Sequence, residues 1–258
     1  MRAPAKEKAF SKETVLCAAF IEAVNRIDLD RRISASKWVC YAETCGWDIL
    51  LARRSDGFQI GVEAKLSLNA KVLMQAAEGP WVDRQGPDCR AVLVPVDCNA
   101  ALAGLAAYCA ITVIRMRRVG GEWSGHQPFS PQLPHAERRS YGNEDWHELM
   151  PSRRHALPDY VPDVAAGAPC PVQLTTWKIG ALKLAILLEN SGFLLRADFK
   201  RHGIDIRRWI ASGWITAGDA GFRAGVMPDF RMQHPRVWEK IAADKKQWAR
   251  TDLLEFVP

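Results

Sequence analysis

Two acids and a lysine, close together in the chain, have the types and spacing needed for metal-assisted hydrolysis. Asp48 opens one apolar segment, and Glu63 and Lys65 lie in the next. Carboxylate oxygens are the ligands that Mg²⁺ prefers, and this ion usually keeps several waters. A bound metal acidifies such a water and polarises a phosphate, while a lysine can orient the water, remove its proton or neutralise developing charge. The trio therefore predicts hydrolysis of a phosphodiester bond, with Mg²⁺ as the cofactor and Mn²⁺ as a substitute.

The surrounding segments predict a β-hairpin that brings the three side chains together. Two apolar stretches, 46–53 and 58–66, flank an Asp-Gly pair, which is a strong turn signal. Because strand side chains alternate between two faces, Glu63 and Lys65 share a face, and Asp48 starts the neighbouring strand. The other interpretation is a surface ion pair on an edge strand, which would contribute little stability and would not need the first acid.

The elements around the hairpin predict a mixed α/β domain. In chain order, we expect a helix at 11–26, strands at 37–45, 46–53 and 58–66, a helix at 67–78, a strand at 90–96, a helix at 99–110 and a strand at 111–119. Helical spacing of the apolar residues predicts that the first helix buries Val15, Leu16, Ala19, Ala23 and Ile27. The resulting order is αβββαβ with an added αβ unit.

The motif and the order of elements together resemble the PD-(D/E)XK nucleases, which have a restriction-endonuclease-like fold. Asp48 matches the first acid of the motif, Glu63 the second and Lys65 the lysine. Trp47 stands at the position of the name-giving proline, which varies widely in the family. The resemblance covers about residues 10–119. It implies a Mg²⁺-dependent nuclease in which the two acids ligate the metal.

Two further polar residues match the family pattern less specifically, and a third is a candidate by its position alone. Members often carry an extra acid on the first helix, and Glu22 is our candidate for it. Some members place a glutamine near the substrate on the helix after the lysine strand, where Gln75 lies. Glu43, at the end of an earlier strand, could also reach the site. Glu22 and Gln75 have an equally good interpretation as solvated side chains, and for Glu43 an ordinary edge-strand charge is the favoured interpretation.

The composition excludes several classes of protein. The chain has 258 residues, 48% hydrophobic and 25% charged, which fits two globular domains rather than a disordered chain. No apolar run approaches the roughly 20 residues of a membrane helix, and the charged N-terminus lacks an apolar signal core. An odd number of cysteines without a Cys-x-x-Cys pair favours reduced thiols and a cytoplasmic location. The net charge of +6 suits a polyanionic partner.

A proline-rich stretch separates two parts of the chain. Proline at this density prevents long helices and central strands. We therefore predict a nuclease-like domain at 1–120, a connector at 121–176 and a second domain at 177–258. The histidines of the connector lack metal-ligand spacing, which argues against a histidine metal site or a His-Asn-His nuclease.

The last part of the chain has the pattern of a winged helix-turn-helix domain. Helices are expected at 179–189, 196–201 and 204–211, followed by a hairpin around the turn at 217–221. In such a domain the third helix enters the major groove of DNA.

The third helix predicts how this domain meets DNA. We expect Ile206, Trp209 and Ile210 to face the core, and Arg207 and Arg208 to contact phosphates or guanines. The basic residues expected to add backbone contacts are Lys200, Arg201 and Arg223. The other interpretation is a protein-packing module whose arginines are solvated.

Three hypotheses follow from the sequence. The first is a Mg²⁺-dependent DNA endonuclease whose winged helix holds duplex DNA, an architecture that looks like that of some methylation-directed restriction enzymes. A phage origin would fit this hypothesis. The second is a non-catalytic DNA-binding protein or regulator on a nuclease scaffold, and the third is a winged-helix module with a protein partner. Double-strand cutting by one site per chain would usually require a homodimer.

Overall fold

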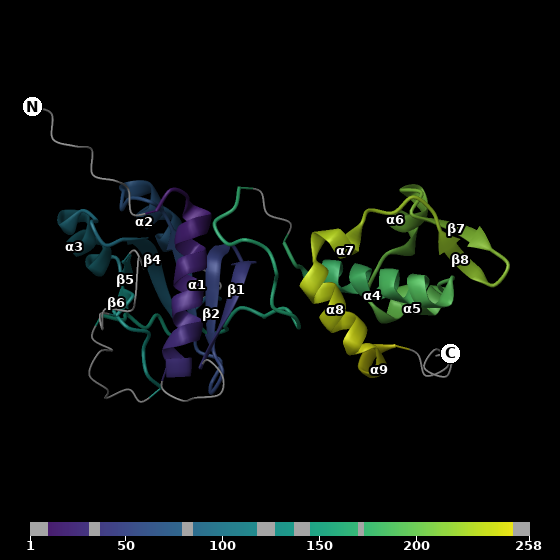
Figure 1. Cartoon of the computed structure of the whole chain (residues 1–258), viewed down its shortest axis with the longest axis horizontal. Coiled ribbons are helices and arrows are strands. Elements are labelled where there is room, and N and C mark those ends of the chain that lie inside the picture. Colours follow the sequence, from purple (N-terminus) through teal and green to yellow (C-terminus); the bar gives the residue numbers. More distant parts are fainter. Residues whose placement is uncertain are drawn as a thin grey trace, which may run out of the picture. The chain divides into compact units, whose positions relative to one another are not determined.

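The computed structural model divides the chain into two units (Figure 1). Unit 1 comprises Met1–Leu157 and Ala165–Pro171, and unit 2 comprises Pro158–Val164 and Val172–Pro258. The structure describes residues 10–30, 37–78, 85–117, 127–136, 145–169 and 173–249. Within these residues, no helix has the length and apolar character needed to cross a membrane.

A six-stranded mixed sheet forms the centre of unit 1, with its strands in sequential order. The strands are β1 (Trp38–Thr44), β2 (Trp47–Arg53), β3 (Gln59–Ala64), β4 (Cys89–Pro95), β5 (Ile111–Met116) and β6 (Phe129–Ser130). The first three strands pair antiparallel, β3, β4 and β5 pair parallel, and β6 returns antiparallel. The predicted hairpin is thus β2–β3, and β3 is flanked on both sides. Mixed α/β architecture is confirmed for this unit.

Three helices cover the sheet (Figure 1): α1 (Glu13–Asp30), α2 (Ala70–Ala77) and α3 (Ala100–Tyr108). The crossover helices α2 and α3 begin where Asn69 and Asn99 accept hydrogen bonds from the first free N–H groups. α2 packs on β3 and β4 through Val72, Leu73 and other apolar side chains. The helices packed around β3 therefore bury that strand, and its polar residues Glu63 and Gln59 lie in a largely apolar environment.

The buried face of α1 agrees only in part with the predicted one. Leu16 and Ala23 are buried as expected, and the side chain of Ile27 lies outside the described residues. Val15 is 45% exposed, whereas Leu16, Phe20 and Val24 are buried. These three recur every fourth residue, and Phe20 makes an edge-to-face contact with Phe129 of β6 at 5.0 Å between ring centroids. Adjacent apolar residues at 15 and 16 left the face ambiguous, and the aromatic contact decides it.

The proline-rich segment predicted as a connector, 121–176, is shared between the two units. Much of it packs onto unit 1, where Arg154 forms an ion pair with Asp88 at 2.7 Å. The side chain of Gln59 exchanges two hydrogen bonds with the backbone of His155. Proline keeps this segment out of the sheet interior, but side-chain contacts still hold it against unit 1.

Unit 2 is mainly helical with one two-stranded sheet. Its elements are α4 (Thr176–Ser191), α5 (Arg196–Arg201), α6 (Ile206–Ala211), β7 (Ile215–Gly218), β8 (Gly221–Ala224), α7 (Phe230–Gln233), α8 (Pro235–Ala243) and α9 (Lys245–Trp248). Leu194, between α4 and α5, pairs with Phe222 of β8 through two backbone hydrogen bonds of 2.8 Å. Gly221 is required beside this bridge, because a Cβ there would lie 2.5 Å from the Leu194 carbonyl oxygen.

The core of unit 2 corrects one predicted position on α6. Trp209 is fully buried, with Phe199 and Trp214 edge-on to its ring at centroid distances of 5.4 and 5.5 Å. Ile206 is half-buried, but Ile210, which we expected to face the core, is 46% exposed. A helix of only six residues presents a narrow face, and the large indole occupies it.

Truncating the two neighbouring side chains of α6 should have unequal effects. We expect Trp209→Ala to lower the free energy of unfolding of unit 2 by about 3–5 kcal/mol, because it empties a buried aromatic site. Ile210→Ala should change it by less than about 1 kcal/mol. Urea denaturation followed by circular dichroism measures both, and equal losses would contradict the placement of α6.

Candidate functional site

Asp48 and Glu63 lie opposite each other at the open end of the β2–β3 hairpin. The antiparallel register pairs Ile49 with Val62, so the next pair along is Asp48 with Glu63. Directly opposed residues of antiparallel strands point to the same face. Asp48 Oδ2 accepts a hydrogen bond from the backbone N–H of Ala64 at 2.8 Å, which fixes this carboxylate against β3. The register thus brings the two predicted metal ligands together.

Lys65 comes directly after β3 and belongs to the same cluster as Glu63. Its N–H donates to the Leu93 carbonyl oxygen at 3.0 Å, which continues the pairing with β4. Its Nζ forms an ion pair of 2.8 Å with Glu13 Oε2 at the start of α1. Burial alone would lower the pKa of Lys65, but this hydrogen bond and the charge of Asp48 raise it overall. The lysine is therefore a cation at neutral pH.

Glu63 is the most perturbed acid of the cluster. Its side chain is buried in β3, and burial, followed by the negative charge of Asp48, raises its pKa to about 7. Burial also raises the pKa of Asp48, although the Ala64 N–H and the Lys65 charge oppose this. Acids whose charged forms are disfavoured in this way are frequent at functional sites.

A further acid, from β1, lies within electrostatic reach of the pair. Glu43 Oε1 accepts hydrogen bonds from the N–H groups of Gly167 and Ala168 at 2.6 and 3.2 Å. Burial and the charge of Asp48 nevertheless raise its pKa. Its charge also helps to raise the pKa of Glu63, so Glu43 belongs to the cluster, whereas the sequence had favoured an ordinary edge-strand charge at this position.

The acid that α1 contributes is Glu13, not the predicted Glu22. Glu22 is exposed and forms an ion pair with Arg26 at 2.6 Å on the helix surface. The separation of the two acids along the chain corresponds to about two and a half helical turns, so they face opposite sides of α1. The sequence does place Glu13 in the first turn of the helix. Which end of the sheet this turn packs against depends on tertiary packing, so the sequence alone did not identify Glu13 as the acid near Lys65.

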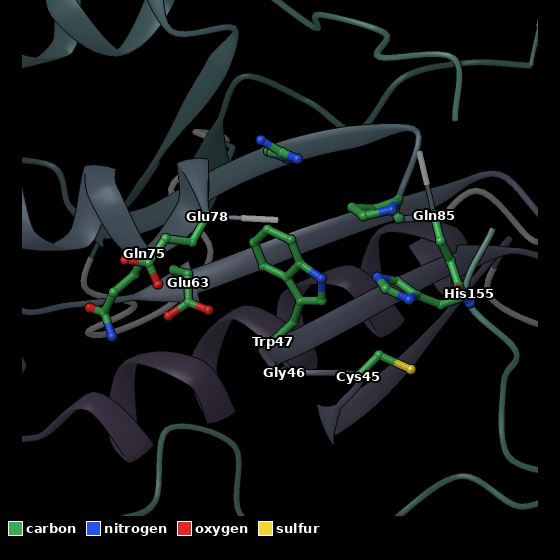
Figure 2. A pocket seen from close by; sticks show the side chains of 11 residues that line it. Cys45, Gly46, Trp47, Glu63, Gln75, Glu78, Gln85 and His155 are labelled. Carbon is green, nitrogen blue, oxygen red and sulfur yellow. The ribbon is translucent and has the colours of Figure 1, made fainter. Parts of the chain in front are cut away.

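Gln75 lies with Glu63 in a cavity of about 240 Å³ (Figure 2). Trp47 forms part of the wall, and Arg90 and His155 also line the cavity. The Oε1 atom of Gln75 is buried and has no hydrogen-bond partner in the described part of the chain. The predicted glutamine thus lines the same cavity as Glu63, and its amide oxygen has no partner in the described residues.

The donor set of the cluster fits Mg²⁺. Among the described residues, no group of three or more His, Cys, Asp or Glu side chains is arranged to hold a metal ion, so the candidate ligands are the pair Asp48 and Glu63. Mg²⁺ commonly takes one or two protein carboxylates and completes its shell with water and substrate phosphate. A pair of carboxylates, one buried and one half-buried, can supply these two ligands.

The predicted DNA-contacting residues all belong to unit 2. Their side chains are exposed on α5, α6 and β8: Lys200, Arg201, Arg207, Arg208 and Arg223. Asp205 caps α6 by accepting a hydrogen bond from the N–H of Arg207 at 2.9 Å. The cap therefore stabilises the backbone at the start of α6, and the exposed side chains of Arg207 and Arg208 are free to contact a binding partner.

No family model, curated protein or solved structure matches this chain.

The raised pKa of Glu63 predicts a pH-dependent stability. Between about pH 4.5 and about pH 7 the folded protein keeps a proton that the unfolded chain has released, so the free energy of unfolding should fall as the pH rises. Glu63→Gln should flatten this dependence, measured as the melting temperature at a series of pH values without metal.

Metal ions should reverse this trend, because a metal competes with the proton on Glu63. Stabilisation by Mg²⁺ should increase from about pH 5 to about pH 8 in the wild type. Glu22→Gln serves as the control and should behave like the wild type. An identical pH profile for Glu63→Gln and the wild type would show that Glu63 does not titrate in this range.

Proposed function

We propose that unit 1 is a Mg²⁺-dependent DNA endonuclease of the PD-(D/E)XK type. The observation that carries the proposal is the opposition of Asp48 and Glu63 across the β2–β3 hairpin, with Lys65 beside them. The element order α1-β1-β2-β3-α2-β4-α3-β5 supports it, because this is the order expected for the restriction-endonuclease-like core. Without the register between β2 and β3, the three residues would be only a short motif.

Asp48 and Glu63 would hold Mg²⁺ through their carboxylate oxygens. When bound, the ion lowers the pKa of its water and polarises the phosphate. Glu63 must lose its proton to act as a ligand, so its pKa of about 7 predicts activity that rises through neutral pH. Asp48, already oriented by the Ala64 N–H, keeps a fixed position during this change.

Lys65 supplies positive charge rather than a base in this proposal. Its raised pKa keeps the ammonium group protonated at neutral pH. An ammonium beside the phosphate stabilises the negative charge that grows on the phosphate oxygens in the transition state. Glu13 holds this side chain through the 2.8 Å ion pair and thus acts as a positioning residue. It takes the place that the family resemblance gave to Glu22.

We further propose that unit 2 is a winged helix-turn-helix domain that binds DNA. Helices α4, α5 and α6 are followed by the β7–β8 hairpin, and the Leu194–Phe222 bridge adds the short third strand typical of this fold. The exposed arginines of α6 support a role for it as the recognition helix, with Arg223 of β8 on the wing.

A DNA-binding protein without cleavage is the second candidate function. It is favoured by one observation, that the exposed arginines of α6 belong to unit 2 and the acidic cluster to unit 1, so DNA binding by unit 2 does not require the cluster. The two candidates differ in a single outcome, which is the hydrolysis of DNA in the presence of metal.

Cleavage of supercoiled plasmid and of single-stranded DNA tests the nuclease directly. We expect hydrolysis with Mg²⁺ or Mn²⁺ and none with EDTA, and a loss of roughly 10²-fold or more in Lys65→Ala because a positive charge beside the transition state is removed. Lys71→Ala, which removes an exposed lysine on α2, is the matched control. Metal-dependent cleavage that survives in Lys65→Ala would contradict the assigned site, and DNA binding without any cleavage would favour the second candidate.

DNA binding by unit 2 should depend on Arg207 and Arg208. Replacing both by alanine in the full chain should weaken binding and reduce the slope of log Kd against log salt by about 0.9 for each phosphate that the arginines had neutralised. Arg231→Ala is the control, because this exposed arginine of α7 lies 3.8 Å from Glu189. A gel-shift titration at several salt concentrations measures the slope. Equal slopes for the double variant and the control would leave unit 2 without a DNA-binding role.

A further inference from the structure

The cavity beside Glu63 contains groups that the hydrolytic cluster does not use. Its volume of about 240 Å³ lies below the roughly 300–1,000 Å³ of pockets for drug-sized ligands. It therefore suits a small ligand. Figure 2 shows Glu63 and Gln75 toward one end, Gln85 and His155 toward the other, and the ring of Trp47 between them.

The wall formed by Trp47 is flat and held in place. Its indole packs directly on Gly61 of β3, where a Cβ atom would come within 2.3 Å of the ring. Only glycine at this position lets the ring lie against the strand, and the side chain is 7% exposed. Trp47 directly precedes Asp48 in β2, so the flat wall adjoins the catalytic cluster. One face of the indole is thus covered by Gly61, and the small part of the residue that stays exposed borders the cavity, where it can contact the edge of a planar ring.

Two buried polar atoms of the cavity residues have no partner. They are Gln75 Oε1 and Arg90 Nε, both without a hydrogen bond in the described part of the chain. Arg90 is anchored by a 2.8 Å hydrogen bond from Nη1 to the carbonyl oxygen of Ala77, at the end of α2. Both atoms are themselves covered, but the two residues are only half-buried and line the cavity, so a ligand there can reach the other polar atoms of these side chains.

The far end of the cavity is also held in place. The side-chain amide of Gln59 bonds the backbone of His155 in both directions, at 2.9 and 3.0 Å. Arg153 Nη2 donates to Gln85 Oε1 at 3.3 Å, and the two residues form a backbone bridge. The cavity is thus bounded at this end by side chains whose backbone is fixed to unit 1.

We propose that this cavity binds one unstacked nucleobase of the DNA, in the nucleotide next to the bond that is cut. The base packs against the exposed part of Trp47, and its edge hydrogen-bonds to the side chains of Gln75 and Arg90. Amide and guanidinium groups match the donors and acceptors of base edges, and enzymes that read a base outside the stack combine such bonds with contacts to aromatic and apolar side chains. Glu63 lines both the cavity and the acidic cluster, which places the base beside the scissile phosphate. The assignment to DNA rests on the proposed nuclease function.

Nuclear magnetic resonance of the full-length, ¹⁵N-labelled protein tests the site without any cleavage. The probes are the four deoxynucleoside 5′-monophosphates, with 2-deoxyribose 5-phosphate as the control ligand. The indole N–H signal of Trp47 is identified by its absence in Trp47→Phe. We expect at least one nucleotide, but not the sugar phosphate, to shift this signal.

A matched pair of variants then tests the polar contacts. Gln75→Leu should weaken the affinity for the nucleotide by roughly tenfold, because a buried hydrogen-bonding group is removed. Gln127→Leu, at an exposed position of unit 1, should leave the affinity unchanged. Equal affinities of the two variants would overturn the proposed contacts, and no shift of Trp47 with any nucleotide would overturn the base site.

Oligonucleotides bound to Lys65→Ala identify the source of the base. Tighter binding of a mismatched than of a matched duplex indicates a base extruded from a duplex, because an unpaired base costs less to extrude. Tighter binding of a single strand than of either duplex indicates an already unstacked base. Plasmid cleavage without a nucleotide-induced shift would defeat this inference alone. A shift of Trp47 without cleavage would defeat the nuclease proposal alone.

Discussion

The pairing register of the β2–β3 hairpin is the constraint on which the candidate site depends. It places Asp48 and Glu63 directly opposite each other in partly buried positions, where two like charges repel. A shift of the register by one residue would send one of the acids to the other face. The neighbouring groups limit the cost of this arrangement: the Ala64 N–H bonds Asp48, Lys65 supplies a positive charge, and Glu63 can retain a proton.

The rest of unit 1 is organised around that end of the hairpin. The pairing of β3 with the parallel strand β4 continues to the backbone of Lys65, which fixes the lysine at the C-terminal end of β3. The first turn of α1 brings Glu13 to this lysine, and the segment at Gly167 binds Glu43 through its backbone N–H groups. A buried acid with a raised pKa is costly for stability. A site that uses the acid as a metal ligand gives a reason for that cost.

Local patterns in the sequence predicted the hairpin and the pair of acids well, because both depend on short-range rules. The Asp-Gly turn and the alternation of strand side chains are sufficient to place Asp48, Glu63 and Lys65. The contribution of α1 was not predictable in this way. The choice between Glu13 and Glu22 depends on how the helix rotates and slides on the sheet, which the Phe20–Phe129 contact helps to decide.

The same limit explains the errors in the second half of the chain. The pattern of α6 placed Trp209 correctly in the core, but on so short a helix it could not separate Ile210 from the buried face. The density of prolines in 121–176 argued against long regular elements, and before α4 the described parts of this segment contain only the two-residue strand β6. It carried no information about the side-chain contacts, such as Arg154 with Asp88, that attach this segment to unit 1.

The claim that Asp48 and Glu63 together hold a divalent metal can be measured most directly with Mn²⁺. Electron paramagnetic resonance reports the free ion, so its signal falls as the protein binds Mn²⁺. The account predicts that the wild type binds the ion in competition with Mg²⁺, and that Asp48→Asn/Glu63→Gln does not, while Glu22→Gln binds like the wild type. Equal Mn²⁺ binding by the double variant and the wild type would contradict it.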